Sequence, residues 1–387
     1  MSTTSVSNIL YVGLDVHKEW IVIAVLPADA ERPTQVDKVP NEPKALRKYF
    51  ARLADRGEIR ACYEASGAGY VLQRAMREWG YPCAIIAPSL IPQRAGHQRK
   101  HDRYDATQLA RLYRAGELTS IRIPTEAEER VRDLVRCRGT FQREVLRARH
   151  YVLKFLTRRG VRYTLGKCHW TRAHHTWLDR LTRGDELIAE DRVVFQEYLA
   201  LLRYALQRRD ALDREIERLA IAPALAAAVG VLGCFRGIKT QAAMTLATEI
   251  GDWQRFATAG QMMAFVGLVS REASSGQTEK RGGITKAGNS HCRHVLIQAA
   301  WAYRHAPRVG AALARRQRGQ PAAAITHAWK AQHRLHKLYR HLAYRKRPQV
   351  AVVAVARELI GFLWAAMRES PAVSTATTAP TFTQEAA

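Results

Sequence analysis

The chain has 387 residues, of which 47% are hydrophobic, and its 61 Lys and Arg against 35 Asp and Glu give a formal net charge of +26. This length allows two or three domains with a buried core, and so large a positive charge favours nucleic acid as a partner. Because we find neither a basic leader nor an apolar run near the roughly 18 to 20 residues that span a bilayer, we expect a cytoplasmic, nucleoid-associated protein. The six cysteines form no Cys-x-x-Cys pair, which argues against a zinc ribbon and a disulfide framework.

The first predicted element is a β-hairpin over residues 9–26, with two apolar halves that meet at a turn through residues 17–19. Its first strand carries Asp15. A carboxylate inside a central strand is costly unless it is paired or coordinates a cation, so we expect a metal ion as its partner. Judged alone, Asp15 fits equally well a strand-end aspartate that accepts hydrogen bonds from backbone N–H groups.

Helices and strands then alternate along the chain. The spacing of apolar residues predicts helices over 42–54 and 70–79. Short apolar runs predict strands over 59–63, which delivers Glu64 at its end, and over 81–87. This alternation predicts an α/β domain with a sheet that is covered on its faces.

Two further acids open the next helix. Residues 92–100 are basic and polar without an apolar period and predict a loop, after which an amphipathic helix begins at Asp102 and Asp105. Residues three apart share one helix face, so these two carboxylates point the same way. Taken alone, the pair suits equally well an N-cap at Asp102 that is assisted by Asp105 in the first turn.

The middle of the chain, residues 126–219, is charged and helical. Its apolar stripes predict two long antiparallel helices that are broken near 160–184. These helices would form a coiled coil and a contact between subunits, and a helical bundle within one subunit is an equal alternative. One cysteine and three histidines in the break match no strong zinc template, and we favour solvated or nucleic-acid-facing side chains for them. They are Cys168, His169, His174 and His175.

The last third of the chain carries two nucleic-acid signals. Residues 228–249, around Gly237, resemble a helix-hairpin-helix, which binds phosphates through backbone N–H groups at a helix start, although a plain helix turn fits too. From residue 280 to 357 there is no Asp or Glu but there are 17 Lys and Arg, interleaved with His and Tyr in a way that suits phosphate contact and base stacking. The candidate nucleic-acid-binding residues are Lys280, Arg281, Lys286, Arg293, Arg315, Arg316, Arg318, Arg334, Lys337, Arg340, Arg345, Lys346 and Arg347. Residues 371–387 have the composition of a disordered tail.

Four acids therefore stand at a strand, a strand end and a helix start: Asp15, Glu64, Asp102 and Asp105. Phosphodiester chemistry commonly uses two Mg²⁺ ions about 3.5 to 4 Å apart, and such ions bind several carboxylate oxygens from different elements. An RNase H-like sheet can bring acids from a hairpin strand, a neighbouring strand and a following helix together.

Four motifs in the chain can be compared jointly with known families. They are GLDVHK at 13–18, YEASGAGY at 63–70, KHDRYDA at 100–106 and SSGQTEKRGGITKAGN at 274–289. With them, most of residues 9–367 resembles the DEDD insertion-sequence transposases of the IS110 and IS1111 group, whose first domain is similar to the RuvC resolvase. His101 and Tyr104 stand where that group more often has Thr and Arg, and both aspartates are intact.

The resemblance implies that the four acids bind two Mg²⁺ ions and that Ser275, directly before the glycine of the SG motif, is a nucleophile that forms a phosphoserine link to DNA. From the residues alone, Lys280 and Arg281 would help a charged transition state there, but a turn serine is favoured.

The resemblance also implies an organisation and a set of partners. We expect an α/β, RNase H-like (RuvC-like) catalytic domain over 1–125, a long-helix region over 126–222 and a mostly helical C-terminal transposase domain over 223–370. The implied partners are double-stranded DNA, at the element ends and the target, and a structured guide RNA encoded beside the gene. We expect a homodimer or homotetramer.

Two other functions remain open on the sequence. A RuvC-like endonuclease would hydrolyse DNA junctions with water and the same acids, without a covalent intermediate. A non-enzymatic DNA- or RNA-binding protein would use the acids only structurally. An actin-like kinase also begins with an apolar hairpin and an aspartate, but a second glycine-rich phosphate loop has no convincing counterpart here.

Overall fold

The computed structural model describes residues 8–92, 102–275 and 278–370, except for the side chains of residues 273–281. The chain forms two units, Met1–Pro124 and Thr125–Ala387, and each is described by itself. The predicted loop over 92–100 and the predicted tail lie, apart from residue 92, outside the described residues. The finer domain limit expected at residue 222 stays a prediction.

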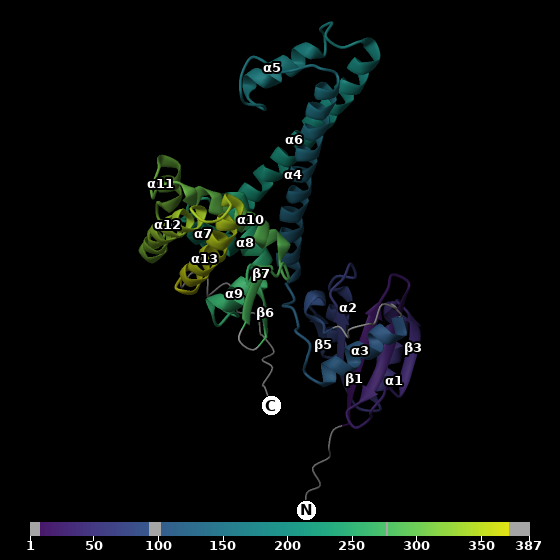
Figure 1. Ribbon diagram of the computed structural model, residues 1–387. Helices are drawn as coiled ribbons and strands as arrows, with labels where there is room; N and C mark the ends of the chain where they lie inside the picture. Colours follow the sequence, from purple (N-terminus) through teal and green to yellow (C-terminus); the bar gives the residue numbers. More distant parts are fainter. Residues whose placement is uncertain (1–7, 93–101, 276–277, 371–387) are drawn as a thin grey trace, which may run out of the picture. The chain divides into compact units, whose positions relative to one another are not determined.

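The first unit is built on a five-stranded mixed sheet (Figure 1). The strand order is β3-β2-β1-β4-β5. The first three strands form an antiparallel meander, and β4 and β5 run parallel to β1. The strands are β1 Ile9–Val16, β2 Trp20–Pro27, β3 Gln35–Pro40, β4 Glu58–Glu64 and β5 Cys83–Ile86. The predicted hairpin and the predicted strand that ends at Glu64 are confirmed. The edge strand β3 was not predicted, because none of its residues is fully buried and it shows no apolar run.

Helices cover both faces of this sheet. On one face α1 and α2 bury Leu46, Phe50 and Met76 in a core shared with alternate residues of β1, β2 and β4. On the other face α3 packs through Ala106 and Leu109. The helices are α1 Pro43–Ala54, α2 Val71–Glu78 and α3 Asp102–Arg114, with a short 3-10 helix η1 at Pro88–Leu90. The predicted α/β domain and its three helices are confirmed.

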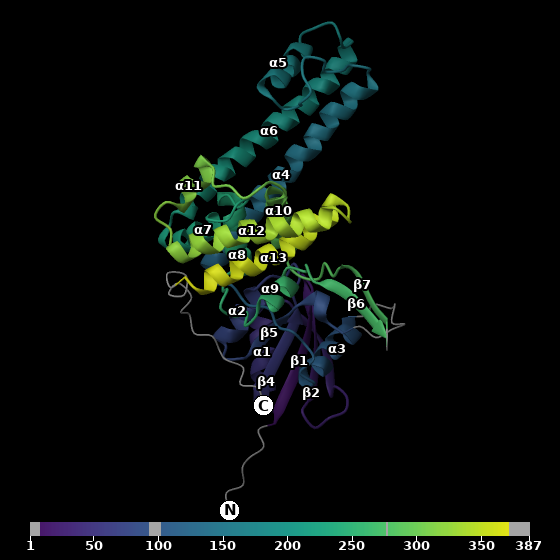
Figure 2. The ribbon, with the colours of Figure 1, turned by 60° about the vertical axis from the view of Figure 1, so that its left-hand side comes forward.

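Two long helices open the second unit, α4 Glu126–Arg158 and α6 Ala189–Ala220, and α5 Arg172–Leu181 lies at the far end of the pair (Figures 1 and 2). The two long helices are antiparallel, since Phe155 stacks on Phe195 at one end and Arg138 pairs with Asp213 towards the other. Their shared core repeats at spacings of three and four residues. It includes Val145, Ala148, Val152, Phe155, Phe195, Leu199 and Leu202. The predicted antiparallel pair is confirmed within one chain, and a contact between subunits stays a prediction.

The rest of the second unit surrounds one apolar core. Phe235, Trp253, Leu296, Leu335 and Leu359 are among its buried residues. The elements are α7 Pro223–Gly233, α8 Thr240–Ile250, α9 Ala259–Phe265, β6 Ser270–Ser275, β7 Thr278–Ile284, α10 Ser290–Ala300, η2 Trp301–Arg304, α11 Ala311–Gln317, α12 Ala322–Ala343 and α13 Pro348–Arg368. The mostly helical character is as predicted, but the β6–β7 hairpin was not predicted because its polar strands carry no apolar alternation.

The helix α13 corrects one expectation from the sequence. Its length and composition would allow it to cross a membrane, so the statement that no apolar run approaches that length was wrong for Pro348–Arg368. Half of that window is buried inside the structure, and Val352, Val355 and Leu359 belong to the core of the second unit. The apolar composition of α13 is therefore accounted for by packing.

The turn between α7 and α8 depends on Gly237. Its φ is +85°, and a Cβ there would lie 2.4 Å from the carbonyl oxygen of Ala299. Glycine therefore allows both the left-handed turn and the close approach of α10. The two helices predicted around Gly237 are present, and their binding to phosphates stays a prediction.

Candidate active site

Asp15 lies near the end of the central strand β1, on the sheet face that α3 covers. Gly13, two residues earlier, faces the same way. A Cβ at Gly13 would lie 2.0 Å from the carbonyl oxygen of Ala106 and 2.6 Å from the backbone nitrogen of Ala110, both in α3. Only glycine lets the helix backbone approach the strand so closely, and this approach brings the first turn of α3 to Asp15.

Two side chains meet Asp15 at this point. Nε2 of His17, in the β1–β2 turn, lies 3.1 Å from Oδ2 of Asp15 and 3.4 Å from Oδ2 of Asp102, the first residue of α3. One donor atom from each of the three residues lies within 4.8 Å of the others. The side chain of Asp15 is 24% exposed and that of Asp102 is 49% exposed, so the cluster opens to solvent on the α3 side.

The environment of Asp15 disfavours its ionised form. Partial burial raises the pKa of Asp15 above its ordinary value of 3.8, and the negative charges of Asp102 and Asp105 raise it further, while His17 opposes them. A divalent cation between these groups would reverse the effect, because it stabilises the ionised carboxylates. The charge of Asp105 thus contributes to the raised pKa of Asp15, although Asp105 lies outside the cluster of Asp15, His17 and Asp102.

Glu64 belongs to the same face of the sheet. Leu14 pairs with Tyr63 in the parallel β1–β4 ladder, so Asp15 and Glu64 are the next residues along the two strands. Cys62, two residues before Glu64, faces α3, since its Sγ lies 3.8 Å from a carbonyl oxygen of that helix. The fold thus puts all four predicted acids on one face, and the residues present fit a hard divalent cation such as Mg²⁺.

Ser275 belongs to the second unit. It is the last residue of β6 and pairs with Thr278 across the β6–β7 turn. The side chain of Ser275 and those of Lys280 and Arg281 are outside the described residues. The structure therefore places the backbone of Ser275 at the tip of a hairpin.

The base of this hairpin is tied to the helical core. The backbone N–H of Thr285 donates to the carbonyl oxygen of Val269 at 2.9 Å, and that of Asn289 donates to Phe265 at 2.8 Å. Gly288 has φ of +109°, and a Cβ there would lie 2.2 Å from the carbonyl oxygen of Phe265. The segment after β7 is thus held against the end of α9 by backbone contacts that need glycine.

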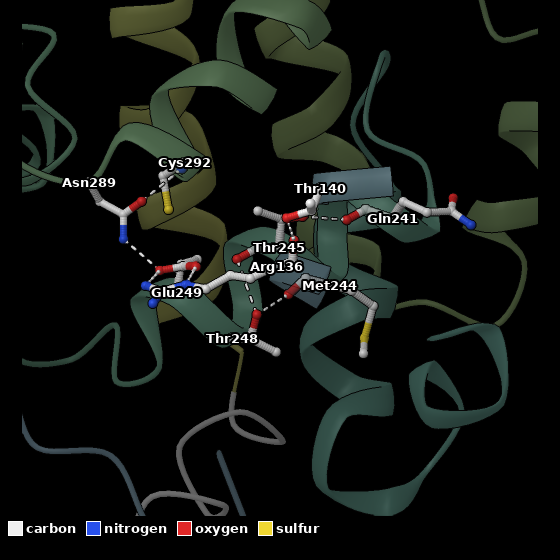
Figure 3. A network of polar contacts seen from close by, with 9 residues as sticks. All are labelled: Arg136, Thr140, Gln241, Met244, Thr245, Thr248, Glu249, Asn289 and Cys292. Carbon is white, nitrogen blue, oxygen red and sulfur yellow. Dashed lines mark hydrogen bonds and ion pairs between the residues drawn. The ribbon is translucent and has the colours of Figure 1, made fainter. Parts of the chain in front are cut away.

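A buried polar network extends from that segment (Figure 3). The carboxylate of Glu249, in α8, accepts two hydrogen bonds from Arg136 of α4, at 2.6 and 2.9 Å, and one from Nδ2 of Asn289 at 2.8 Å. Oδ1 of Asn289 in turn accepts from the backbone N–H of Cys292 and caps α10. The network joins α4, α8 and α10 to the segment that follows the hairpin.

Glu249 remains ionised in this network. Its side chain is 1% exposed. Burial alone would raise its pKa, but the hydrogen bonds from Arg136 and Asn289 more than offset this and hold the pKa of Glu249 below its ordinary value of 4.5. A charge buried this deeply requires its partners, so the network is a structural support of the second unit.

The exposed side of α12 is basic and aromatic. Trp329 is 43% exposed, and its ring lies 4.6 Å from that of His333. Lys337 lines two adjoining depressions along the helix, and Arg340 lines the second of them. Tyr344 at the end of the helix is 90% exposed. This combination of cations and accessible rings is typical of single-stranded nucleic-acid surfaces.

Among the described side chains, three predicted nucleic-acid-binding residues have partners inside the chain. Arg293 donates to the carbonyl oxygen of Val266 at 2.9 Å, and Arg316 donates to that of Gly233 at 3.0 Å. Arg334 forms a bidentate ion pair with Glu358. The predicted residues whose side chains are described and that are exposed are Lys286, Arg315, Arg318, Arg334, Lys337, Arg340, Arg345, Lys346 and Arg347.

His174 is fully buried, which corrects the expectation that this histidine faces solvent or nucleic acid. Its ring lies 4.8 Å from that of Tyr163 and 5.5 Å from that of Trp177. Burial lowers the pKa of His174 to about 4, with smaller contributions from His169 and His175. Among the described residues, the histidines and the cysteine of this region form no metal cluster.

Comparisons with known proteins agree with this geometry. A DEDD-type IS110 transposase profile, described as "Transposase", matches residues 12–159, which include all four acids, and the profile "Transposase IS116/IS110/IS902 family" matches residues 231–314, which include Ser275. A putative transposase of Sinorhizobium fredii, y4qE, is 38% identical over 93% of this chain and 89% of its own length. The transposase for insertion sequence element IS1533 of Leptospira borgpetersenii is 31% identical over 87% of this chain and 98% of its own length. The chain belongs to the IS110 family of transposases.

Membership of the IS110 family makes the protein a transposase, an enzyme that acts on DNA. The DEDD domain of this family implies an RNase H-like fold, with which the mixed sheet of the first unit agrees. DEDD transposases typically depend on a metal ion, and the cluster around Asp15 offers a place for one.

The sequence reasoning missed one member of the cluster in this IS110-family chain, His17. The signal was its position two residues after Asp15, inside the GLDVHK motif, where it was assigned to the turn alone. A tight turn can return a side chain to the strand that it follows, and imidazole is a common metal ligand.

Proposed function

We propose that this IS110-family transposase cuts and rejoins DNA strands of an insertion sequence with a Mg²⁺ site in its first unit and Ser275 as nucleophile in its second. A structured RNA encoded by the element would select the strands. The observation that supports the proposal is the close packing of the α3 backbone against Gly13. This packing brings Asp102 to Asp15, on the sheet face that also carries Glu64.

Asp15, Glu64, Asp102 and Asp105 would hold two Mg²⁺ ions. When bound, Mg²⁺ supplies Lewis-acid polarisation of the phosphoryl group and stabilises the negative charge that develops on it. The chain contributes carboxylates from three separate elements, β1, β4 and α3, whose backbones are fixed by the sheet and by the contact at Gly13. Ligands on rigid elements keep their geometry during the reaction.

Ser275 would perform the covalent step. Its Oγ loses a proton and attacks the phosphorus, the Ser–O–P bond forms, and the bond from phosphorus to one deoxyribose oxygen breaks, with that oxygen leaving as a hydroxyl. A hydroxyl of a second strand can then displace the serine in the reverse sense, which rejoins DNA without an external energy source. The position of Ser275 at a hairpin tip suits a nucleophile that must reach a phosphodiester.

The basic side of α12 and the exposed cations near it would bind DNA and the guide RNA. Lys337 and Arg340 can contact phosphates, and Trp329 and Tyr344 can stack on bases. The protein would act in the cytoplasm, in association with the nucleoid.

A second copy of the chain would cover the apolar residues that α6 leaves exposed. Val193 is 60% exposed. Tyr204 is 57% exposed, and one edge of its ring also contacts Phe141 of α4. We therefore propose a homodimer or homotetramer, which light scattering on the purified protein tests directly.

Trapping the covalent intermediate tests the proposed chemistry. Wild-type protein incubated with RNA, DNA and Mg²⁺ and stopped with denaturant should carry a DNA strand that migrates with the protein. Ser275→Ala should lose this species and all recombination while it still binds nucleic acid. Ser274→Ala is the matched control at the neighbouring position, and it should keep at least partial activity.

Other outcomes separate the alternatives. If Ser275→Ala still cleaves DNA while Asp15→Asn does not, the protein is a metal-dependent hydrolase of the RuvC type. If the wild type itself yields no DNA product, the protein has a nucleic-acid-binding role without catalysis. Sequencing the RNA that co-purifies with the protein tests the guide, and a defined RNA from the flanking element is the expected result.

A further inference from the structure

We propose that His17 is a direct ligand of the divalent cation at the Asp15–Asp102 position and makes this position prefer Mn²⁺ over Mg²⁺. The inference rests on the proposed metal-dependent function and deepens it. It assigns a role to a residue outside the four acids of the DEDD set.

The distances within the cluster match those between ligands of one ion. Adjacent ligands of an octahedral ion with bonds of about 2.1 Å lie about 3.0 Å apart. Nε2 of His17 lies 3.1 Å from Oδ2 of Asp15 and 3.4 Å from Oδ2 of Asp102. The three donor atoms lie within 4.8 Å of one another, and a shared cation would replace the hydrogen bond between His17 and Asp15.

The backbone of His17 is fixed before any ion binds. Its N–H donates to the carbonyl oxygen of Trp20 at 3.0 Å, and its own carbonyl oxygen accepts from Nδ2 of Asn41 at 2.8 Å. The imidazole ring also lies 5.9 Å from the ring of Trp20. A side chain on such a constrained turn loses little conformational freedom when it becomes a ligand.

The chemistry of the donor set determines the preferred ion. Carboxylate oxygens alone suit Mg²⁺ and Mn²⁺ alike, whereas an imidazole nitrogen favours transition metals. Exchanging one oxygen ligand for the nitrogen of His17 therefore raises the affinity for Mn²⁺ relative to Mg²⁺.

Direct binding measurements on the full-length protein without nucleic acid test the proposal. Calorimetric titration with MnCl₂ and with MgCl₂ should give at least about tenfold tighter binding of Mn²⁺ to the wild type. His17→Gln should weaken Mn²⁺ binding by at least about tenfold and change Mg²⁺ binding by less than about threefold. Pulsed electron paramagnetic resonance of the Mn²⁺ complex should show ¹⁴N coupling from a coordinated imidazole, and His17→Gln should lose it.

Two further variants separate the possible failures. Glu19→Gln changes a neighbouring exposed residue of the same turn and should leave both affinities and the ¹⁴N signal unchanged. Asp15→Asn should abolish binding of both ions at this position. If Asp15→Asn abolishes binding but His17→Gln keeps the wild-type Mn²⁺ affinity and the wild type shows no ¹⁴N coupling, His17 is not a ligand although the metal site exists. If Asp15→Asn binds both ions as the wild type does, the metal site itself, and with it the proposed function, is refuted.

Discussion

Replacing Gly13 by alanine should displace α3 from the sheet and disable the acidic cluster while the first unit stays folded. The added Cβ would lie 2.0 Å from the carbonyl oxygen of Ala106, and real Cβ contacts are essentially never shorter than 3.0 Å. The backbone of α3 must therefore move away by about 1 Å, because the neighbouring atoms are backbone and have no rotamer to change.

The expected magnitudes follow from this displacement. Overpacking of this kind costs about 1–3 kcal/mol, which leaves a typical domain folded but should lower its melting temperature by roughly 4–12 °C. Asp102 begins the displaced helix, so its distance from Asp15 and His17 changes by a similar amount. A misplacement of about 1 Å at a reacting centre can reduce the rate by about 10²-fold.

Circular dichroism melting and the rate of strand cleavage measure the two effects separately. Divalent-cation affinity, measured well below the melting temperature, shows whether the cluster has been disturbed in a folded protein. Gly67→Ala is the stability control, since nothing lies within 4 Å of the Cβ that it would add. If Gly13→Ala has the melting temperature, cation affinity and cleavage rate of the wild type, then Gly13 does not position α3 as we infer.

The remaining predictions concern the cluster, the buried network and the basic surface. Asp15→Asn should abolish strand exchange but leave the melting temperature and the nucleic-acid affinity close to those of the wild type, as melting and filter binding would show. Arg136→Met should destabilise the second unit by about 3 kcal/mol in chemical denaturation, because the buried carboxylate of Glu249 loses both hydrogen bonds that Arg136 donates. Since the folded pKa of Glu249 is depressed, its ionised form stabilises the fold above pH 4.5 and this contribution is lost as the pH falls below that value. The stability difference between wild type and Glu249→Gln should therefore be largest near neutral pH and shrink in acid, and a constant difference would contradict the assignment. Nucleic-acid affinity should fall by about 10³-fold between 50 and 200 mM salt if at least six phosphates are contacted, and a flat response would exclude the polyanion surface.

Much of the fold could be predicted because its signals are local. The apolar halves of the hairpin predicted β1 and β2, and prolines at helix starts agree with the beginnings of α1, α7 and α13. Thr125 and Glu128 form a capping box that begins α4. Periods of two or 3.6 residues are written into neighbouring positions, so they can be read without knowledge of the rest of the chain.

The elements that carry the four acids could also be predicted, but the environment of the acids could not, and their role as metal ligands stays a prediction. A carboxylate in an apolar strand is conspicuous in any sequence, and Asp15 was singled out as a candidate metal ligand in that way. The contact of Gly13 with Ala106 and Ala110, which makes the cluster, spans more than 90 residues of sequence. His17 joins the cluster only because the turn after β1 returns it to Asp15 and the later helix brings Asp102 to the same point.

Only the tertiary structure decided the remaining features, and each depends on contacts between distant residues. The strands β3 and β6–β7 have weak propensity of their own and are stabilised by pairing with neighbours. The burial of His174 follows from the packing of aromatic rings around α5. Glu249 could be charged and buried only because Arg136, 113 positions earlier, and Asn289, 40 positions later, supply its hydrogen bonds. The sequence specifies each of these side chains, but the free energy of burying a polar group depends on partners that only the folded chain brings within reach.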